Sequence, residues 1–409
     1  MMHILFLTDN FPPEGNAPAT RTHEHAREWV RLGHTVTVIT CAPNFPEGVV
    51  FEGYRNRWHM REVMDGIEVV RVKTYITANE GFARRILDYA SFGMMGLIVG
   101  LCQRRPDVIV STSPQFFCAC GAWALSALRR IPWVFELRDI WPASITAVGA
   151  MQKSAVIGLL EKVEMFLYRR ADRIVSVTHS FKRELSARGI DADKIDVVIN
   201  GVDLSAFAPS AEKNRALAAG YGLSDKFVVG YIGTHGLAHA LDKVLDAAGR
   251  LAGREGICFL LVGGGAERAT IEDLVVSRGL KNVVMMPRQP KENMAAVWSL
   301  CDISLISLRD TPLFTQVIPS KIFESMGMGL PMVIACPKGE ATEMLERTHS
   351  GVVVPPEDPQ ALAETISRLF SDQGVLKELA QSSAESAQLY DRARQAALMI
   401  ASLKSATGN

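Results

Sequence analysis

The stretch TQVIPSKIFESMGMGLP, residues 315–331, decides how the rest of the sequence is interpreted. It predicts a loop, a short helix and the start of a strand, with Pro319 in the first helical turn, where a missing N–H costs nothing. Ser320 and Lys321 then lie at the positive end of the helix, where free amides and an ammonium favour phosphate. Glu324 follows one turn later, on the same face as Ser320, and is placed to accept the hydroxyls of a ribose. The pattern predicts a nucleotide site, and the alternative is an ordinary helix–strand unit.

Length and composition limit the class of protein. A chain of 409 residues is too long for one typical core, so two domains are expected. Lys+Arg 44 and Asp+Glu 44 balance, which gives no general attraction to nucleic acid. The seven cysteines are scattered in apolar runs, as in proteins of a reducing compartment. His3–Thr8 is a strand-like run without the basic region or cleavage site of a signal peptide, so a cytoplasmic location is expected.

Apolar runs of strand length alternate with helical segments along most of the chain, which indicates parallel sheets covered by helices. The alternation begins at His3–Thr8, stops in the polar stretch at residues 205–214, and then restarts. We therefore predict an α/β protein with two Rossmann-like, doubly wound domains. The expected boundaries are residues 1–204, residues 205–383, and a last helix at residues 384–409 that packs back on the first domain.

Two glycine-containing loops follow predicted strands of the second domain. They are residues 233–236 and residues 263–265, and the second reads Gly-Gly-Gly. Ligands of doubly wound sheets bind at the carboxyl ends of the strands. These loops and the helix that starts at Ser320 are therefore expected to converge on an anionic nucleotide.

The first domain offers weaker signals at the same edge of its sheet. Gly15 would let the backbone approach a ligand, and Arg21 is placed to reach an anion, although neither fits a GxGxxG motif. Arg138 and Asp139 follow a predicted strand, which makes Asp139 a candidate for contacting a reacting hydroxyl. The alternatives are a plain loop for Gly15 and Arg21, and an Arg–Asp pair that closes a strand end.

Residues 82–105 form an unusual segment, with a nearly uncharged run between Arg84-Arg85 and Arg104-Arg105. The run is shorter than the roughly 18–20 residues that a membrane-spanning helix needs. Two interpretations stay open: a buried core helix, or a surface helix that dips into a membrane interface.

Taken together, the motifs resemble the GT-B glycosyltransferases of family 4, which are retaining enzymes that use nucleotide-sugar donors. More narrowly, the chain resembles the branch that builds bacterial O-antigens and capsules on a lipid carrier, such as N-acetylfucosamine transferases. The resemblance covers nearly the whole chain. It rests on FPPEG at residues 11–15, GHTVTV at 33–38, ELRDIWP at 136–142, NGVD at 200–203, YIGTHG at 231–236 and PSKIFE at 319–324.

The resemblance implies two domains facing across a cleft and retaining transfer of a sugar from a nucleotide-diphosphate donor. The expected donor is a UDP-sugar, with an N-acetylated deoxyhexose as the sugar. The expected acceptor is a lipid-linked saccharide of O-antigen or capsule biosynthesis, at the cytoplasmic face of the inner membrane. No Asp-x-Asp motif of the metal-binding kind is evident in the sequence, so we expect no metal and no other cofactor.

Individual residues depart from the family pattern. The second Glu of the family's Glu-x7-Glu motif matches Glu324, but the first falls on Gln316, which cannot act as a base. The family's two phosphate-binding cations fall on Thr234 and His239, and its histidine before Asp139 is replaced by an arginine. If His239 binds diphosphate as an imidazolium, activity should fall as it loses its proton.

The resemblance therefore gives the following set of expected contacts. The catalytic candidates are Asp139, Lys321 and Arg138; the donor-binding candidates are Gly15, Asn16, Gly233, Thr234, His239, Gly264, Arg288, Gln316, Ile318, Pro319, Ser320 and Glu324; the acceptor-binding candidates are Arg21 and Trp141.

Two other functions fit the same architecture. A nucleotide-sugar 2-epimerase would turn over the donor without any acceptor. A lectin-like or scaffold protein whose transfer site had decayed at Gln316, Thr234 and His239 would bind nucleotide weakly or not at all.

Overall fold

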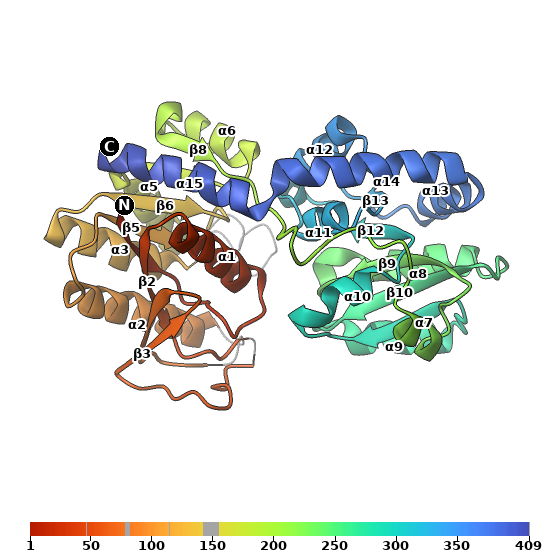
Figure 1. The fold of residues 1–409 in the computed structure, drawn as a ribbon, viewed down its shortest axis with the longest axis horizontal. Coiled ribbons are helices and arrows are strands. Elements are labelled where there is room, and N and C mark those ends of the chain that lie inside the picture. The colour runs from red at the N-terminus through yellow and green to blue at the C-terminus, as the bar shows by residue number, and fades with distance from the viewer. Residues whose placement is uncertain (46, 78–81, 114, 142–154, 409) are drawn as a thin grey trace. The chain divides into compact units, whose positions relative to one another are not determined.

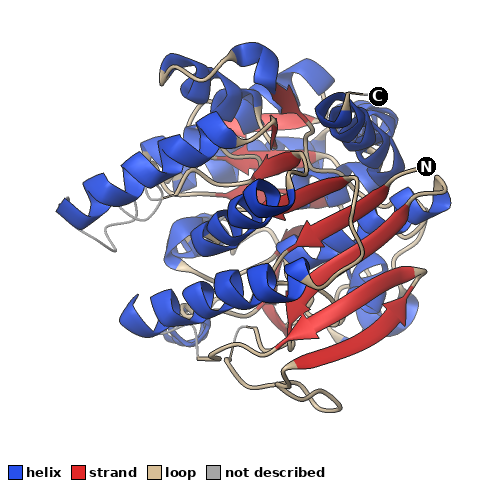
Figure 2. Ribbon diagram, turned by 90° about the vertical axis from the view of Figure 1, so that its left-hand side faces the viewer, coloured by secondary structure: helices blue, strands red, loops and turns tan. Residues whose placement is uncertain are grey.

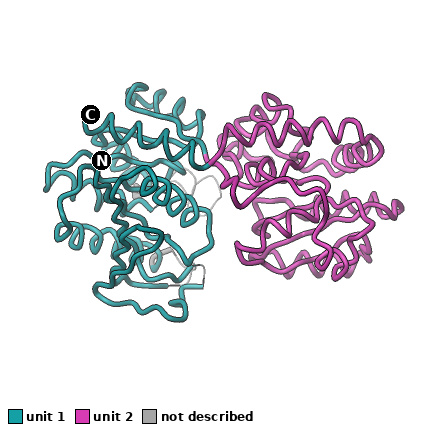
Figure 3. The backbone as a smooth tube through the Cα atoms, in the orientation of Figure 1, with its two compact units in different colours: residues 1–199, 392–409 teal, residues 200–391 magenta. Residues whose placement is uncertain are grey.

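The computed structural model describes residues 1–45, 47–77, 82–113, 115–141 and 155–408. The chain divides into two compact units (Figure 3). Unit 1 comprises Met1–Ile199 and Arg392–Asn409, and unit 2 comprises Asn200–Asp391. The division therefore falls at residue 199 instead of 204, and the segment that returns to unit 1 starts at Arg392 instead of 384. The second difference arises because residues 384–387 complete the helix α14 (Gln373–Ala387) of unit 2.

Unit 1 is built on one eight-stranded sheet whose strand order is β3-β4-β2-β1-β5-β6-β7-β8 (Figures 1 and 2). Every neighbouring pair is parallel except the hairpin of β3 and β4. The order reverses between β1 and β5, and doubly wound sheets bind ligands at the carboxyl ends of the strands at such a point. The strands are β1 (His3–Leu7), β2 (Thr35–Cys41), β3 (His59–Met64), β4 (Ile67–Val72), β5 (Val108–Thr112), β6 (Trp133–Leu137), β7 (Arg173–Ser176) and β8 (Ile195–Val197).

Helices cover this sheet and include the returning C-terminal segment. Asn16 begins α1 as its N-cap, with its side-chain oxygen accepting the amide N–H of Ala19 at 2.9 Å. The indole N–H of Trp29 on α1 donates to the carbonyl of Ala396 on α15 at 3.0 Å, which joins the two ends of the chain in one core. The described α-helices of unit 1 are α1 (Ala17–Arg31), α2 (Phe82–Leu101), α3 (Phe116–Arg129), α5 (Ala155–Arg170), α6 (His179–Ala187) and α15 (Arg392–Thr407).

The helix α2 has two different faces. One face packs so closely on α3 that a Cβ added at Gly93 would lie 2.3 Å from the carbonyl oxygen of Phe117. The opposite face exposes Leu87, Met94, Ile98 and other apolar side chains. Neither interpretation of this segment from the sequence describes both faces. No helix in the described part of the chain has the length and apolarity needed to cross a membrane.

Unit 2 is built on a six-stranded sheet in the order β11-β10-β9-β12-β13-β14, and all of its neighbouring pairs are parallel. The order reverses between β9 and β12. Helices such as α8 form because apolar residues recur on one face: Val244, Leu245 and Ala248 are fully buried against the sheet. The strands are β9 (Phe227–Ile232), β10 (Ile257–Gly263), β11 (Val283–Pro287), β12 (Ile303–Ser307), β13 (Met332–Ala335) and β14 (Gly351–Val354).

The helices of unit 2 complete a second doubly wound α/β domain, so the predicted fold class is confirmed. They are α7 (Arg215–Gly220), α8 (Leu241–Arg250), α9 (Arg268–Ser277), α10 (Met294–Trp298), α11 (Lys321–Gly327), α12 (Glu340–Thr348), α13 (Pro359–Ser371) and α14.

Candidate functional site

The two glycine loops of unit 2 touch each other through their backbones. They follow β9 and β10, which are neighbours in the sheet. A Cβ added at Gly263 would lie 1.9 Å from the carbonyl oxygen of Gly233, and the amide N–H of His235 donates to the carbonyl of Gly264 at 2.9 Å. Gly233 and Gly263 have φ values of 151° and 146°, so each of them needs glycine for its backbone as well as for space.

Lys321 brings the third predicted segment to the same place. It is the first residue of α11, and its ammonium nitrogen lies 3.7 Å from the ring centroid of Tyr231 on β9. A Cβ added at Gly233 would lie 2.9 Å from the same nitrogen. The structure therefore brings together the loop after β9, the loop after β10 and the start of α11, as the sequence predicts.

The Lys321 ammonium has no hydrogen-bond partner among the described residues, although its Nζ atom is buried. Burial lowers its pKa to about 7, against the opposing effect of the Glu324 carboxylate. Its contact with the face of Tyr231 is a cation–π interaction, which holds the charge without satisfying its N–H donors. The site thus contains a cation that is prepared to donate three hydrogen bonds.

Two histidines complete this cluster. The rings of His235 and His239 lie 6.0 and 5.9 Å from the ring of Tyr231 between centroids. Burial and the Lys321 charge lower the pKa of His239 to about 4, and burial with the Arg268 and Lys321 charges does the same for His235. Both rings are therefore neutral at pH 7 in the free protein, and His239 is not the imidazolium considered from the sequence.

His235 was not among the residues singled out from the sequence. It is fully buried, and neither ring nitrogen has a hydrogen-bond partner in the described structure. The signal that could have identified it is its place in the Gly-Thr-His-Gly turn after β9. The hydroxyl of Tyr231 closes the same turn by donating to the carbonyl of Thr234 at 2.7 Å.

Glu324 lies one helical turn beyond Lys321. Its Oε2 atom accepts the indole N–H of Trp298 at 3.0 Å, and Trp298 is fully buried. A carboxylate that is oriented in this way presents a fixed acceptor geometry, which suits the two hydroxyls of a ribose. Its proximity to Lys321 agrees with the sequence prediction that one short helix supplies both groups.

The other predicted donor contacts of unit 2 are distributed less tightly. Gln316, Ile318, Pro319 and Ser320 are half-buried in the segment that leads into α11. The Ser320 side chain makes no capping hydrogen bond, and α11 has only seven residues. Arg288 is exposed and follows β11, the edge strand two positions from β9.

In unit 1, the candidates Arg138, Asp139 and Trp141 follow β6. The hydroxyl of Ser113 accepts the amide N–H groups of Arg138 at 2.7 Å and Asp139 at 3.1 Å, which fixes this turn. The Trp141 ring packs on that of Phe116, with 4.8 Å between the centroids. Arg138, Asp139 and Trp141 are all partly exposed.

One prediction in unit 1 requires correction. The Arg21 side chain is buried and forms an ion pair with Glu136 at 2.8 Å, which contradicts an acceptor contact. Its outer nitrogens donate to the carbonyls of Ile199 and Val198. Asn16 is occupied as the cap of α1, while Gly15 lies exposed in the loop before it.

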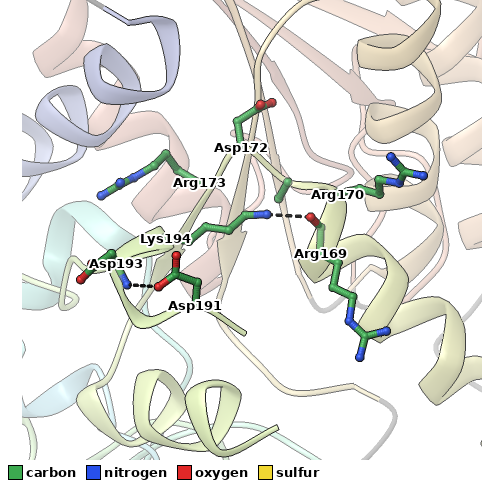
Figure 4. A pocket seen from close by; sticks show the side chains of 8 residues that line it. Arg169, Arg170, Asp172, Arg173, Asp191, Asp193 and Lys194 are labelled. Carbon is green, nitrogen blue, oxygen red and sulfur yellow. Dashed lines mark hydrogen bonds between the residues drawn. The ribbon is translucent and has the colours of Figure 1, made fainter. Parts of the chain in front are cut away.

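A hollow in unit 1 lies at another place (Figure 4). It is lined by residues 169–173, Asp191, Asp193 and Lys194, which lie at or just before the starts of β7 and β8. It therefore lies at the amino ends of these strands, whereas Arg138 and Asp139 lie at the carboxyl end of the parallel strand β6. The Lys194 ammonium is already bonded to the carbonyl of Arg169 at 2.7 Å. We assign no function to this hollow.

Among the described residues, no group of three His, Cys, Asp or Glu side chains could hold a metal ion. Whether the reaction needs a metal is a separate question, and metal independence stays a prediction.

Comparisons with known proteins identify the family. Residues 16–201 match the family model of the glycosyl transferase 4-like domain, and residues 226–372 match that of the glycosyl transferases group 1. The chain is 27% identical over 374 residues to WcaI of Escherichia coli (strain K12), which is named as a colanic acid biosynthesis glycosyl transferase. That match covers 89% of this chain and 91% of WcaI.

Solved structures show the same fold. The crystal structure of Anabaena HepE in complex with UDP and glucose superposes with a TM-score of 0.74 at 19% identity, covering 99% of this chain and 100% of HepE. WaaG, a glycosyltransferase involved in lipopolysaccharide biosynthesis, superposes with a TM-score of 0.69 at 14% identity, covering 99% and 100%. The two matched family models, the WcaI relationship and two doubly wound domains lead to one assignment: this chain is a glycosyltransferase of the GT-B fold and belongs to family 4.

Proposed function

We propose that this enzyme transfers a sugar from a UDP-sugar to a lipid-linked saccharide during the synthesis of a surface polysaccharide, with retention at the anomeric carbon. The proposal rests chiefly on one observation, the buried and unpartnered ammonium of Lys321 between the glycine loops of unit 2. The role in polysaccharide synthesis is supported by the name of WcaI, and UDP is supported by the nucleotide bound in HepE. The transferred sugar is proposed to be an N-acetylated deoxyhexose, on the family resemblance alone.

In this proposal, Lys321 receives the donor diphosphate. The diphosphate carries negative charge in the ground state, and more charge develops on it as the leaving group departs. A preorganised donor in a desolvated site stabilises such charge more effectively than water does. The neutral rings of His235 and His239 can donate one N–H each to the same group, since the free nitrogens have no partner to give up.

The nearby carboxylate would bind the nucleoside. Glu324 is held by Trp298 and can accept hydrogen bonds from both hydroxyls of the ribose. Gln316 cannot act as a base, which agrees with a front-face mechanism in which the departing phosphate takes the acceptor proton. No protein base is then required, and Asp139 in unit 1 would orient the acceptor or donor hydroxyls.

The acceptor and its membrane would contact unit 1. The exposed face of α2 carries Leu87, Met94, Ile98 and Leu101, and their exposed fractions lie between 43% and 64%. Arginines precede and follow this apolar row, as in helices that lie in the interface of an anionic membrane. We therefore propose a peripheral association with the cytoplasmic face of the inner membrane, which would bring the enzyme to its lipid-linked substrate.

The test is a transfer assay with a panel of UDP-sugars, with and without lipid extract. Wild-type enzyme should release UDP and form a lipid-linked product, detected by mass spectrometry, only when the extract is present. Lys321→Met should lower the rate about a hundredfold or more, because donors to a developing oxyanion are commonly worth that much. Lys281→Met, which changes an exposed lysine of the same unit, should retain wild-type activity.

Other outcomes identify the alternatives. Turnover of a UDP-sugar to its 2-epimer without lipid would indicate an epimerase. Absence of both UDP binding and turnover would indicate a decayed site. The configuration of the new glycosidic bond, measured by NMR, tests retention, and inversion would contradict that part of the proposal.

A further inference from the structure

Arg138 is a cation of unit 1 whose guanidinium is only partly satisfied by the residues that the structure describes. It directly follows β6, and the hydroxyl of Ser113 holds its amide N–H at 2.7 Å. Its guanidinium nitrogen Nη1 is buried and has no hydrogen-bond partner, and no ion pair joins it to Glu136 or Asp139 within the described structure. A guanidinium in such a position is costly to keep, since burial removes water and nothing replaces it.

The nearby carboxylates are paired with other arginines, although the Glu136 charge still favours the charged form of Arg138. Glu136 is bound by Arg21 at 2.8 Å, and Glu24 is bound by Arg392 at 2.6 Å. The second oxygen of Glu136 also lacks a partner, but it lies outside hydrogen-bonding reach of Arg138. Arg21 and Arg392, which are both buried, thus occupy the two carboxylates, and the partly exposed Arg138 forms no ion pair with a described residue.

The positive charges of these arginines also act on His25. Its Nε2 atom is buried without a partner. Burial and the charges of Arg21, Arg392 and Arg138 hold the pKa of His25 well below its usual range, so its ring is neutral. Burial lowers the pKa of Arg138 as well, to about 10, so the guanidinium remains charged at pH 7.

We propose that Arg138 anchors an oxyanion subsite and that the oxyanion belongs to the acceptor: a phosphate or carboxylate group of the lipid-linked saccharide. This inference rests on the proposed function. The planar fork of a guanidinium matches such groups with two parallel hydrogen bonds. The acceptor is the expected source because Arg138 lies in unit 1 beside Asp139 and Trp141, whereas the proposed diphosphate site of the donor is built by Lys321 in unit 2.

The kinetic test compares Arg138→Gln and Arg138→Lys with the wild type. Arg138→Gln should raise the KM for the lipid-linked acceptor about tenfold or more, the usual effect of losing hydrogen bonds to a charged group. The KM for the UDP-sugar should stay within about twofold, because the proposed contacts of the donor diphosphate and ribose belong to unit 2 and Arg138 belongs to unit 1. Arg138→Lys should be intermediate, since it keeps the charge and loses the fork.

Thermal unfolding separates this role from a structural one. Arg138→Gln should raise the Tm of the free protein, because it removes a buried charge without a partner. Arg21→Gln should lower the Tm, because it leaves Glu136 buried and unpaired. Arg31→Gln, an exposed change on α1, should leave both Tm and KM unchanged.

A binding test does not depend on turnover. In a Lys321→Met background, inorganic pyrophosphate should still raise the Tm, and adding Arg138→Gln should abolish this increase. The inference is overturned if Arg138→Gln lowers the Tm as Arg21→Gln does, or if it leaves the acceptor KM unchanged. An increase in the donor KM alone would assign the oxyanion to the donor and overturn the assignment to the acceptor. A wild-type enzyme that transfers no sugar would instead refute the proposed function.

Discussion

Donor binding should weaken as the pH rises above 7, because Lys321 must be protonated to hold a diphosphate. Its pKa in the free protein is about 7, since burial opposes the charge. About half of the molecules are therefore charged at Lys321 at pH 7, about a tenth at pH 8 and about a hundredth at pH 9. If only the protonated form binds, the apparent Kd rises in inverse proportion to that fraction. The Kd for UDP should then increase about fivefold from pH 7 to 8 and about fiftyfold from pH 7 to 9.

The other groups around Lys321 do not titrate in this range. The pKa values of His235 and His239 are about 4, so both rings stay neutral. Burial raises the pKa of Tyr231, so its hydroxyl keeps its proton. Glu324 is the carboxylate that favours the charged form of Lys321. The second ionisation of a phosphate lies near pH 6, roughly, so UDP itself changes little above pH 7.

Isothermal titration calorimetry measures both the Kd and the proton uptake. In buffers of different ionisation enthalpy at pH 8, UDP binding should take up about 0.9 proton, the fraction of Lys321 that is neutral before binding. Lys321→Arg keeps its charge throughout, so its Kd should not depend on pH between 7 and 9. Lys321→Met should bind UDP weakly at every pH. A flat wild-type profile without proton uptake would refute the reasoning.

Lys321 should also make the stability of the free protein depend on pH. This stability should increase with pH, whereas UDP binding should weaken. Its folded pKa is lowered, so between about pH 7 and its unfolded pKa the unfolded chain holds the proton that the folded chain has released. Stability contributed by this group therefore increases with pH across that interval. Lys321→Met should remove the dependence and raise the Tm near pH 7, which differential scanning calorimetry can measure.

Three further predictions follow from other parts of the molecule. Gly263→Ala should weaken UDP binding about tenfold or more, because its Cβ would collide with a backbone carbonyl, whereas Gly253→Ala of the same unit meets nothing within 4 Å and should bind normally. Met94→Glu combined with Ile98→Glu should abolish sedimentation with anionic liposomes, and Val276→Glu, an exposed change in unit 2, should not; a folded double variant that still sediments would contradict membrane docking by α2. Transfer activity should survive EDTA, and loss of activity that Mg²⁺ or Mn²⁺ restores would contradict metal independence.

The sequence predicted the features that follow from local pattern. Apolar runs of strand length and the helices between them give the two parallel sheets, because both faces of such a strand must be apolar. The loops at Gly233 and Gly263 were predicted to converge because they end strands of one doubly wound sheet. Their contact is closer than the pattern could indicate, since it depends on backbone dihedral angles that only the structure shows.

The sequence was less informative where long-range pairing decides the outcome. Arg21 looked available for a ligand, but its partner Glu136 lies 115 residues away and occupies it in the core. His239 was considered as an imidazolium, and the burial that makes it neutral is a property of the folded site. The segment at residues 82–105 could not be assigned to core or surface because its closely packed face uses glycines, which carry no hydropathy signal.

Lys321 in unit 2 and Arg138 in unit 1 each carry a buried nitrogen that has no hydrogen-bond partner among the described residues. Both destabilise the free protein, because each charge is desolvated without a hydrogen-bonding partner. An anion that binds either cation recovers this unfavourable energy and so binds more tightly than surface charges alone would allow. The same reasoning predicts that UDP should raise the Tm of wild-type protein, that Lys321→Met should eliminate this gain, and that Arg138→Gln should preserve it. If both variants lose the UDP-induced rise in Tm equally, the two cations bind one ligand. The proposal of two separate anion sites is then wrong.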